Sequence, residues 1–130
     1  MVVVQLSSNG ATTYLVHFRY NVVSDRVVYY PLFCLQFILM GLLRNLGCWL
    51  GDVFIGCILY TDDNVLISPT VHSLQIMLDV CASFAQEVDM KFNSSKSVVM
   101  RVGTRFKLPC KPVMLCDKPL SFVNEAKYLG

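Results

Sequence analysis

The feature that most constrains the fold is an acidic dipeptide between two apolar stretches. The apolar run 53–59 precedes Tyr60, Thr61, Asp62 and Asp63, and a second apolar stretch follows at 65–67. Two such stretches around turn-forming residues predict a β-hairpin with both aspartates at its tip. Adjacent carboxylates repel each other unless something positive lies against them, and Mg²⁺ is the hard cation that prefers oxygen ligands. Alternatively, the pair is ordinary turn chemistry, because Asp adopts turn conformations readily.

A helical period follows the hairpin. The segment 68–70 predicts a helix start, and apolar residues then recur at the spacing of one helix face: Leu74, Met77, Leu78, Cys81, Ala85 and Val88. The opposite face is polar and is expected to meet water: Ser73, Gln75, Asp79, Ser83 and Gln86. A second, more apolar helix is predicted from Pro31 to about Asn45, with Gly47 as its stop.

Strands are predicted on both sides of these elements. Alternating residues indicate an extended segment at 14–20, and a strand at 97–102 ends at Gly103. The proline-containing remainder is expected to be loop with short extended pieces around 113–115 and 121–123. This order predicts an α+β fold, in which an antiparallel β-hairpin and short strands carry helices packed on one face.

The composition is unusually apolar for 130 residues, with 55% hydrophobic and 15% charged residues. This excludes a disordered chain and indicates apolar surface that lacks its natural cover. Residues 1–90 hold 3 of the 11 Lys and Arg residues and 7 of the 9 acids, so the remaining 40 residues are strongly basic. An acidic metal-binding half and a basic phosphate-facing half would fit this split. A solvated basic tail explains the second half equally well.

The cysteines and histidines show no metal-ligand spacing. Four cysteines lie in apolar stretches without a Cys-x-x-Cys pair, which predicts buried free thiols and an intracellular, cytoplasmic or nuclear protein rather than a secreted one: Cys34, Cys48, Cys57 and Cys81. His17 and His72 are expected to be structural or exposed. The 17 uncharged residues 27–43 approach the shortest membrane-spanning length, but Pro31 and Gln36 interrupt them and favour a buried helix.

Four ordered segments resemble the palm domain of reverse transcriptases encoded by non-LTR (LINE-like) retrotransposons. The segments are the Tyr-x-Asp-Asp box at 60–63, the amphipathic helix at 74–84, Phe92-Asn93-x-x-Lys96, and Tyr128-Leu129-Gly130. The resemblance covers residues 51–130. It implies an RNA-directed DNA polymerase that binds template–primer and dNTP and transfers nucleotides with two Mg²⁺ ions. By resemblance, Asp62 and Asp63 are the catalytic metal ligands, Tyr60 and Thr61 contribute to substrate binding, and Lys96 aids catalysis at the triphosphate.

Residues 1–50 form a degraded upstream part of the same predicted palm domain. The family's glutamine-glycine loop is replaced by residues 22–31, of which only Pro31 matches, and no acid precedes Asn21 where a further catalytic aspartate is expected. Fingers and thumb are not recognisable in the sequence. The resemblance therefore implies a fragment that is inactive alone. Two other interpretations remain open: a small membrane-associated protein anchored through 27–43, and a domesticated nucleic-acid-binding module that uses Lys91 to Lys118.

Overall fold

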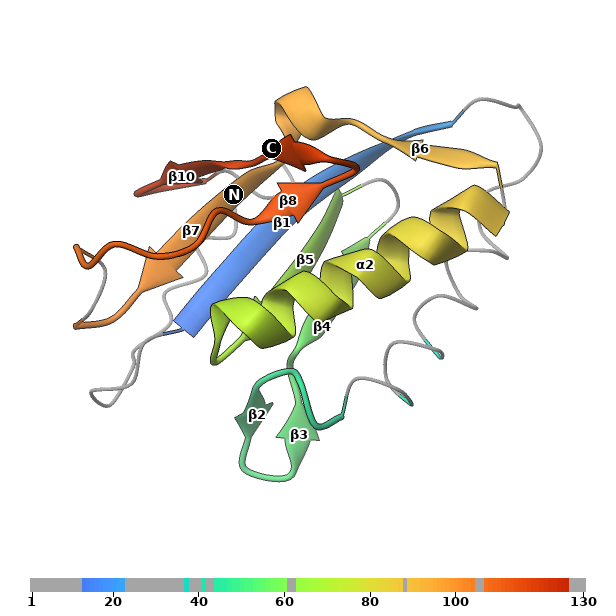
Figure 1. Ribbon diagram of the computed structural model, residues 1–130. Helices are drawn as coiled ribbons and strands as arrows, with labels where there is room; N and C mark the ends of the chain where they lie inside the picture. The colour runs from blue at the N-terminus through green and yellow to red at the C-terminus, as the bar shows by residue number, and fades with distance from the viewer. Residues whose placement is uncertain are drawn as a thin grey trace.

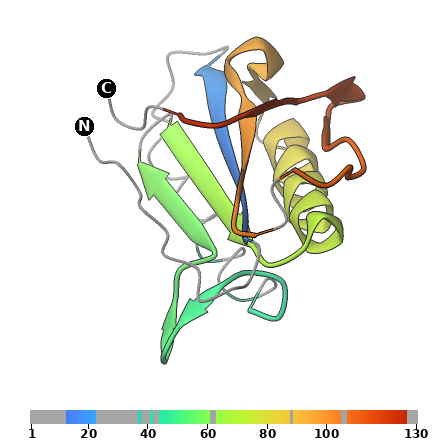
Figure 2. The ribbon, with the colours of Figure 1, turned by 90° about the vertical axis from the view of Figure 1, so that its left-hand side faces the viewer.

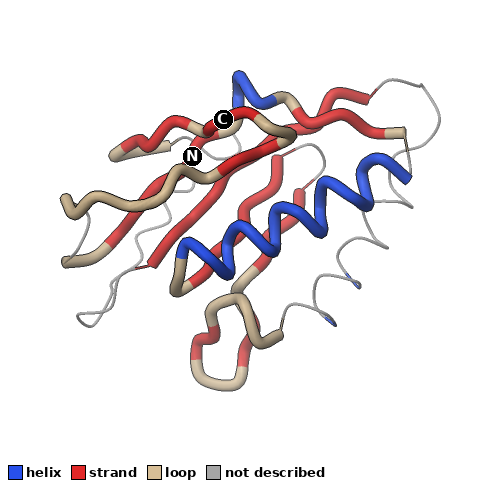
Figure 3. Tube along the Cα trace, viewed as in Figure 1, coloured by secondary structure: helices blue, strands red, loops and turns tan. Residues whose placement is uncertain are grey.

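The computed structural model describes residues 13–22, 37, 41, 44–60, 63–87, 89–104 and 107–126. These residues form a mixed α+β structure in which a central sheet carries one long helix on one face (Figure 1, Figure 3). The predicted α+β class is therefore confirmed.

The central sheet has six strands, with β1 (Thr13–Val22) in the middle. Strand β5 (Asp63–Ser68) lies on one side of β1 and is followed by β4 (Cys57–Tyr60). On the other side lie β7 (Val98–Val102) and then β10 (Ser121–Val123), which is parallel to β7. Strand β6 (Met90–Phe92) pairs with the last residues of β1, and every strand that pairs with β1 is antiparallel to it.

The predicted hairpin exists, but its first strand is shorter than expected. Strands β4 and β5 pair antiparallel from Cys57 opposite Leu66 to Tyr60 opposite Asp63. The prediction of one strand over 53–59 is wrong, because β3 (Val53–Phe54) instead pairs with β2 (Trp49–Leu50) in a separate small hairpin. This β2–β3 hairpin projects away from the central sheet (Figure 1).

Two glycines explain the break between β3 and β4. A Cβ added at Gly56 would lie 2.5 Å from Cζ of Phe54 and 2.8 Å from Cα of Gly47. The chain therefore bends at Gly56, where its backbone lies close to the backbone of Gly47 and the Phe54 ring packs against both. Only glycine leaves room for this contact.

The helix α2 (Val71–Glu87) confirms the periodicity after the hairpin. Its buried residues are five of the six predicted ones: Leu74, Met77, Leu78, Cys81 and Ala85. The Thr70 hydroxyl oxygen accepts a 3.0 Å hydrogen bond from the Ser73 amide and caps the first turn. In side view α2 stands on one side of the sheet (Figure 2). It contacts β5, β6 and β1, and with them it encloses the main core around Val16, Leu66 and Val99.

One residue of the predicted water-facing side of α2 has a structural role instead. The Gln75 amide nitrogen donates to the Met114 carbonyl at 2.9 Å, and the Met114 amide donates back to Gln75 at 2.8 Å. These bonds attach β8 (Met114–Leu115) to the helix, and β8 forms a short hairpin with β9 (Lys118–Pro119). Asp79, Ser83 and Gln86 are exposed as predicted, whereas Ser73 is only partly exposed.

Several predictions fall outside the described residues. Most of the predicted helix 31–45 and Val88 lie there, although Phe37 and Gly41 are helical. Within the described part of the chain, no helix is long and apolar enough to span a membrane. Segment 27–43, on which the membrane alternative depends, lies almost wholly outside that part.

Candidate functional site

The ends of β4 and β5 bring two residues of the box together. Tyr60 is the last residue of β4 and pairs directly with Asp63, the first residue of β5. Thr61 and Asp62 lie outside the described residues. The hairpin forms as the apolar stretches predict, because β5 is buried on both of its faces. One face lies under α2, and the other packs against Leu15.

Asp63 is buried rather than exposed at the tip. The residue is 8% exposed, and its Oδ1 lies 3.1 Å from Nε2 of His17, which is 5% exposed. The expectation that both aspartates stand at the hairpin tip is therefore wrong for Asp63, which begins the paired strand. His17 is structural, as predicted, while His72 on α2 is exposed.

The strand next to the box is β1, which brings His17 within reach of Asp63. Asp63 pairs with Arg19 across β1 and β5, and His17 is two residues earlier on the same strand. Within the described residues, no group of three or more His, Cys, Asp or Glu side chains could hold a metal ion. Since oxygen-rich sites are what Mg²⁺ requires, these residues do not by themselves fit a magnesium centre.

Lys96 lies on the far side of β1 from the hairpin. It ends a short 3₁₀ turn, η1 (Ser94–Lys96), and is exposed. The Asn93 side-chain oxygen holds this turn by accepting bonds from Ser95 Oγ at 2.6 Å and from the Lys96 amide at 3.3 Å. Because η1 contacts β1 and β1 pairs with β5, the Phe-Asn-x-x-Lys segment and Asp63 flank the same strand.

One buried polar residue was not singled out from the sequence. Asn64 is fully buried, and both polar atoms of its side chain lack a hydrogen-bond partner. His17 was expected to be structural or exposed, and its contact with Asp63 was not predicted. A polar residue directly before the apolar run Val65 to Ile67 is the signal that could have identified Asn64, because buried polar groups are rarely left unsatisfied.

The described thiols are free, and burial lowers the reactivity of those that face the core. Burial raises the pKa of the Cys57 thiol to about 12 and raises the pKa of the Cys81 thiol further in the same direction. Cys81 is fully buried, Cys48 and Cys57 are half-buried, and Cys116 is exposed. Protonated thiols are poor nucleophiles, so the two thiols facing the core do not form a catalytic centre.

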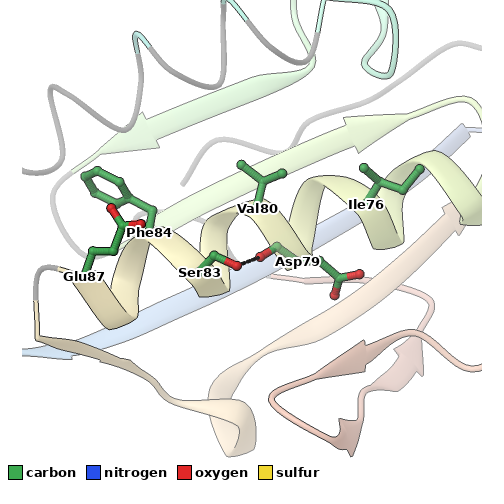
Figure 4. A pocket seen from close by; sticks show the side chains of 6 residues that line it. All are labelled: Ile76, Asp79, Val80, Ser83, Phe84 and Glu87. Atoms are coloured by element: carbon green, nitrogen blue, oxygen red, sulfur yellow. Dashed lines mark hydrogen bonds between the residues drawn. The ribbon is translucent and has the colours of Figure 1, made fainter.

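A shallow pocket on α2 contains none of the predicted site residues. Ile76, Val80 and Phe84 line it at four-residue spacing together with polar neighbours, and they lie on one side of the helix (Figure 4). The Ser83 hydroxyl donates to the Asp79 carbonyl at 3.0 Å and is thereby occupied within the helix. The pocket therefore offers no converging reactive groups.

No family model matches the chain, and neither the curated proteins nor the solved structures contain a significant match.

Proposed function

We propose that the chain is a palm fragment of the reverse transcriptase of a non-LTR retrotransposon, and that it does not transfer nucleotides on its own. In the parent family the reaction is two-metal, RNA-directed DNA synthesis on a template–primer with dNTP. Asp62 is the residue on which any remaining cation affinity of this chain depends, with Mg²⁺ as the cation of the parent family.

The observation that carries the proposal is the order of elements around the box. In the β-hairpin, Tyr60 and Asp63 are the paired residues next to the turn. The hairpin leads directly into α2, which covers one sheet face. The Asn93-capped turn with Lys96 follows and contacts the strand beside the hairpin. Thus three of the four segments that resemble the family are built around one sheet.

The proposal of inactivity is supported by β1. This strand pairs with β5 along the box, so it is where a second metal-binding carboxylate would have to stand. The residue paired with Asp63 is Arg19, and His17 lies two residues earlier on the strand, so neither position is an acid. A positive or hydrogen-bonded neighbour in place of an acid leaves no pair of carboxylates to bridge two cations.

Exposed apolar side chains support the proposal of a fragment. Leu50 and Val53, which pair across the β2–β3 hairpin, are 71% and 63% exposed. Trp49 on the same hairpin is 41% exposed, with Arg44 at 5.5 Å from its ring centroid. Large apolar groups gathered on a projecting hairpin suit contact with further protein.

A segment exchange tests the proposal. Residues 51–104 would replace the corresponding hairpin, helix and strand of an active non-LTR reverse transcriptase whose remaining palm, fingers and thumb are kept. We expect the chimera to extend a primer on an RNA template with Mg²⁺, and Asp62→Asn to abolish the extension.

The matched control is Asp79→Asn, because Asp79 is an exposed acid on α2 outside the box. This variant should extend the primer as the unsubstituted chimera does. A chimera that folds, as judged by circular dichroism and gel filtration, but extends no primer would contradict the assignment of this segment to a palm.

A further inference from the structure

We infer that the shallow pocket on α2 is the docking site of a segment of this chain, residues 32–43. The pocket is lined by Ile76, Val80 and Phe84, which are half-buried, and its polar rim is exposed. The inference does not depend on the proposed function. It also decides what the apolar segment does, because a segment that docks on α2 is part of the core and not a membrane anchor.

The pocket follows an apolar stripe on one flank of α2. Ile76, Val80 and Phe84 are four residues apart and point to the same side of the helix (Figure 4). Val80 and Phe84 also pack against the main core, so the stripe extends the buried face of the helix toward its surface. At about 100° per residue the stripe lies on the flank opposite Gln75, where β8 is attached.

The described residues on either side of the segment lie at the two ends of α2. Val22, the last residue of β1, pairs with Met90, which follows the C-terminal end of α2. At the other end, the Ser68 hydroxyl donates to the Leu46 carbonyl at 2.7 Å, and Ser68 directly precedes the start of α2 at 69–71. The chain between Val22 and Leu46 therefore has to return along the length of α2, about 25 Å for a helix of this size.

A helix over the predicted range 31–45 would be about 22 Å long and would match α2 in length. Leu46 packs against the main core, so the chain arrives on the sheet face that α2 covers. On that face β8 already occupies one flank of α2. The other flank, which carries the pocket, is therefore where a helix antiparallel to α2 fits.

The sequence of the segment supplies a matching apolar face. Phe37 and Gly41 are helical and exposed, so they mark the outer side of the predicted helix. Four leucines fall on the opposite side at helical spacing: Leu32, Leu35, Leu39 and Leu42. Two apolar stripes of this kind are what a pair of packed helices buries between them.

Methyl NMR of the whole, unsubstituted chain tests the inference directly. Nuclear Overhauser effects should connect the methyl groups of Ile76 and Val80 with those of Leu35, Leu39 or Leu42. A folded chain in which the Ile76 and Val80 methyl groups contact no leucine of the segment would overturn the inference.

Two other occupants of the pocket would give different results. In a mixture of two differently labelled samples, Overhauser effects that appear only between copies would show that the pocket holds a second copy of the chain. In dodecylphosphocholine micelles, leucines of the segment that contact acyl chains instead of Val80 would favour the membrane alternative. Either result would overturn the inference.

A double-mutant cycle, measured by urea unfolding of the whole chain, adds an energetic test. Leu39→Ala and Val80→Ala each remove part of the proposed contact, so their effects on the folding equilibrium constant should be coupled by about threefold or more. The matched control is Val53→Ala, because Val53 is 63% exposed on the β2–β3 hairpin, and it should show no coupling to Leu39→Ala. Additive effects of Leu39→Ala and Val80→Ala would overturn the inference, as would equal coupling to Val53→Ala.

Discussion

At the scale of the residue, the side chain of Asn64 in the described core is expected to lower the stability of the fold. It is fully buried, and both its amide nitrogen and its amide oxygen lack partners. A buried polar group without a partner costs about 1–3 kcal/mol. Asn64→Val is therefore expected to stabilise the fold by about 1 kcal/mol or more, helped by the preference of valine for strands.

Urea unfolding measures this effect, with Asn93→Val as the matched control. The Asn93 side chain accepts hydrogen bonds that hold η1, so the control should destabilise the protein. A loss of stability in Asn64→Val would mean that the amide has a partner after all, such as an internal water molecule.

The thiol of Cys57 gives stability a pH dependence. Burial raises its pKa from the ordinary 9.0 to about 12 in the folded state. Between these values the unfolded chain has released the proton and the folded chain has not, so stability is complete below pH 9 and falls as the pH rises toward 12. The free energy of unfolding, measured from pH 7 to 11, should fall less steeply in Cys57→Ala.

The comparison variant is Cys116→Ala, because Cys116 is exposed. Its stability should show the same alkaline slope as the unsubstituted protein. An unchanged slope in Cys57→Ala would show that the Cys57 thiol is more accessible to solvent than the fold implies.

At the scale of the element, the bend between β3 and β4 depends on Gly56. A Cβ at this position would meet the Phe54 ring at 2.5 Å and the Gly47 backbone at 2.8 Å, and a backbone atom cannot rotate away. Gly56→Ala should destabilise the protein by about 1–3 kcal/mol, the usual cost of overpacking. Thermal unfolding measures the loss.

Gly41→Ala is the control for this substitution. No atom lies within 4 Å of a Cβ added at Gly41, so stability should stay the same or rise slightly. Equal stability of Gly56→Ala and Gly41→Ala would show that the two backbones at Gly47 and Gly56 are not in close contact.

The elements also show which parts of the fold can be predicted from the sequence. The helical period at Leu74, Met77 and Leu78 predicted α2 correctly, because burial on one helix face imposes that spacing on the sequence. The break at Gly56 and the pairing of β6 with β1 could not be predicted, since both depend on contacts between distant segments. The Gln75 bonds to Met114 were missed for the same reason.

The candidate site was likewise predictable only in part. The turn chemistry of the acidic dipeptide predicted the hairpin, but the neighbour of Asp63 is set by the pairing of β1 with β5. The pairing register of two strands that lie far apart in the sequence cannot be derived from one sequence alone. The roles predicted for Thr61 and Asp62 by family resemblance stay predictions.

At the scale of the whole molecule, the apolar composition and the exposed side chains agree. The sequence predicted apolar surface without its natural cover, and Leu50, Val53 and Leu108 are each more than half exposed. A palm fragment would have such surface where its neighbouring domains normally pack. The isolated chain is accordingly expected to extend no primer on an RNA template with Mg²⁺ or Mn²⁺.

Primer extension with the purified 130-residue chain measures this. Extension that depends on the template and disappears in Asp62→Ala would show that the chain is an active enzyme. Extension that persists in Asp62→Ala would point to a contaminating polymerase, and the assay would be repeated after further purification.

The central claim is that this chain retains a palm whose deficiency lies in β1, and exchanging that strand tests it most directly. Two chimeras of an active non-LTR reverse transcriptase would both carry residues 51–104, but one would keep the host enzyme's own central palm strand while the other would take residues 13–22. Primer extension is the measurement. We predict extension with the host strand and none with β1 of this chain, because no residue of β1 is an acid that could share the cations with the box. Folded chimeras that are both inactive, or that are both active, would contradict the account.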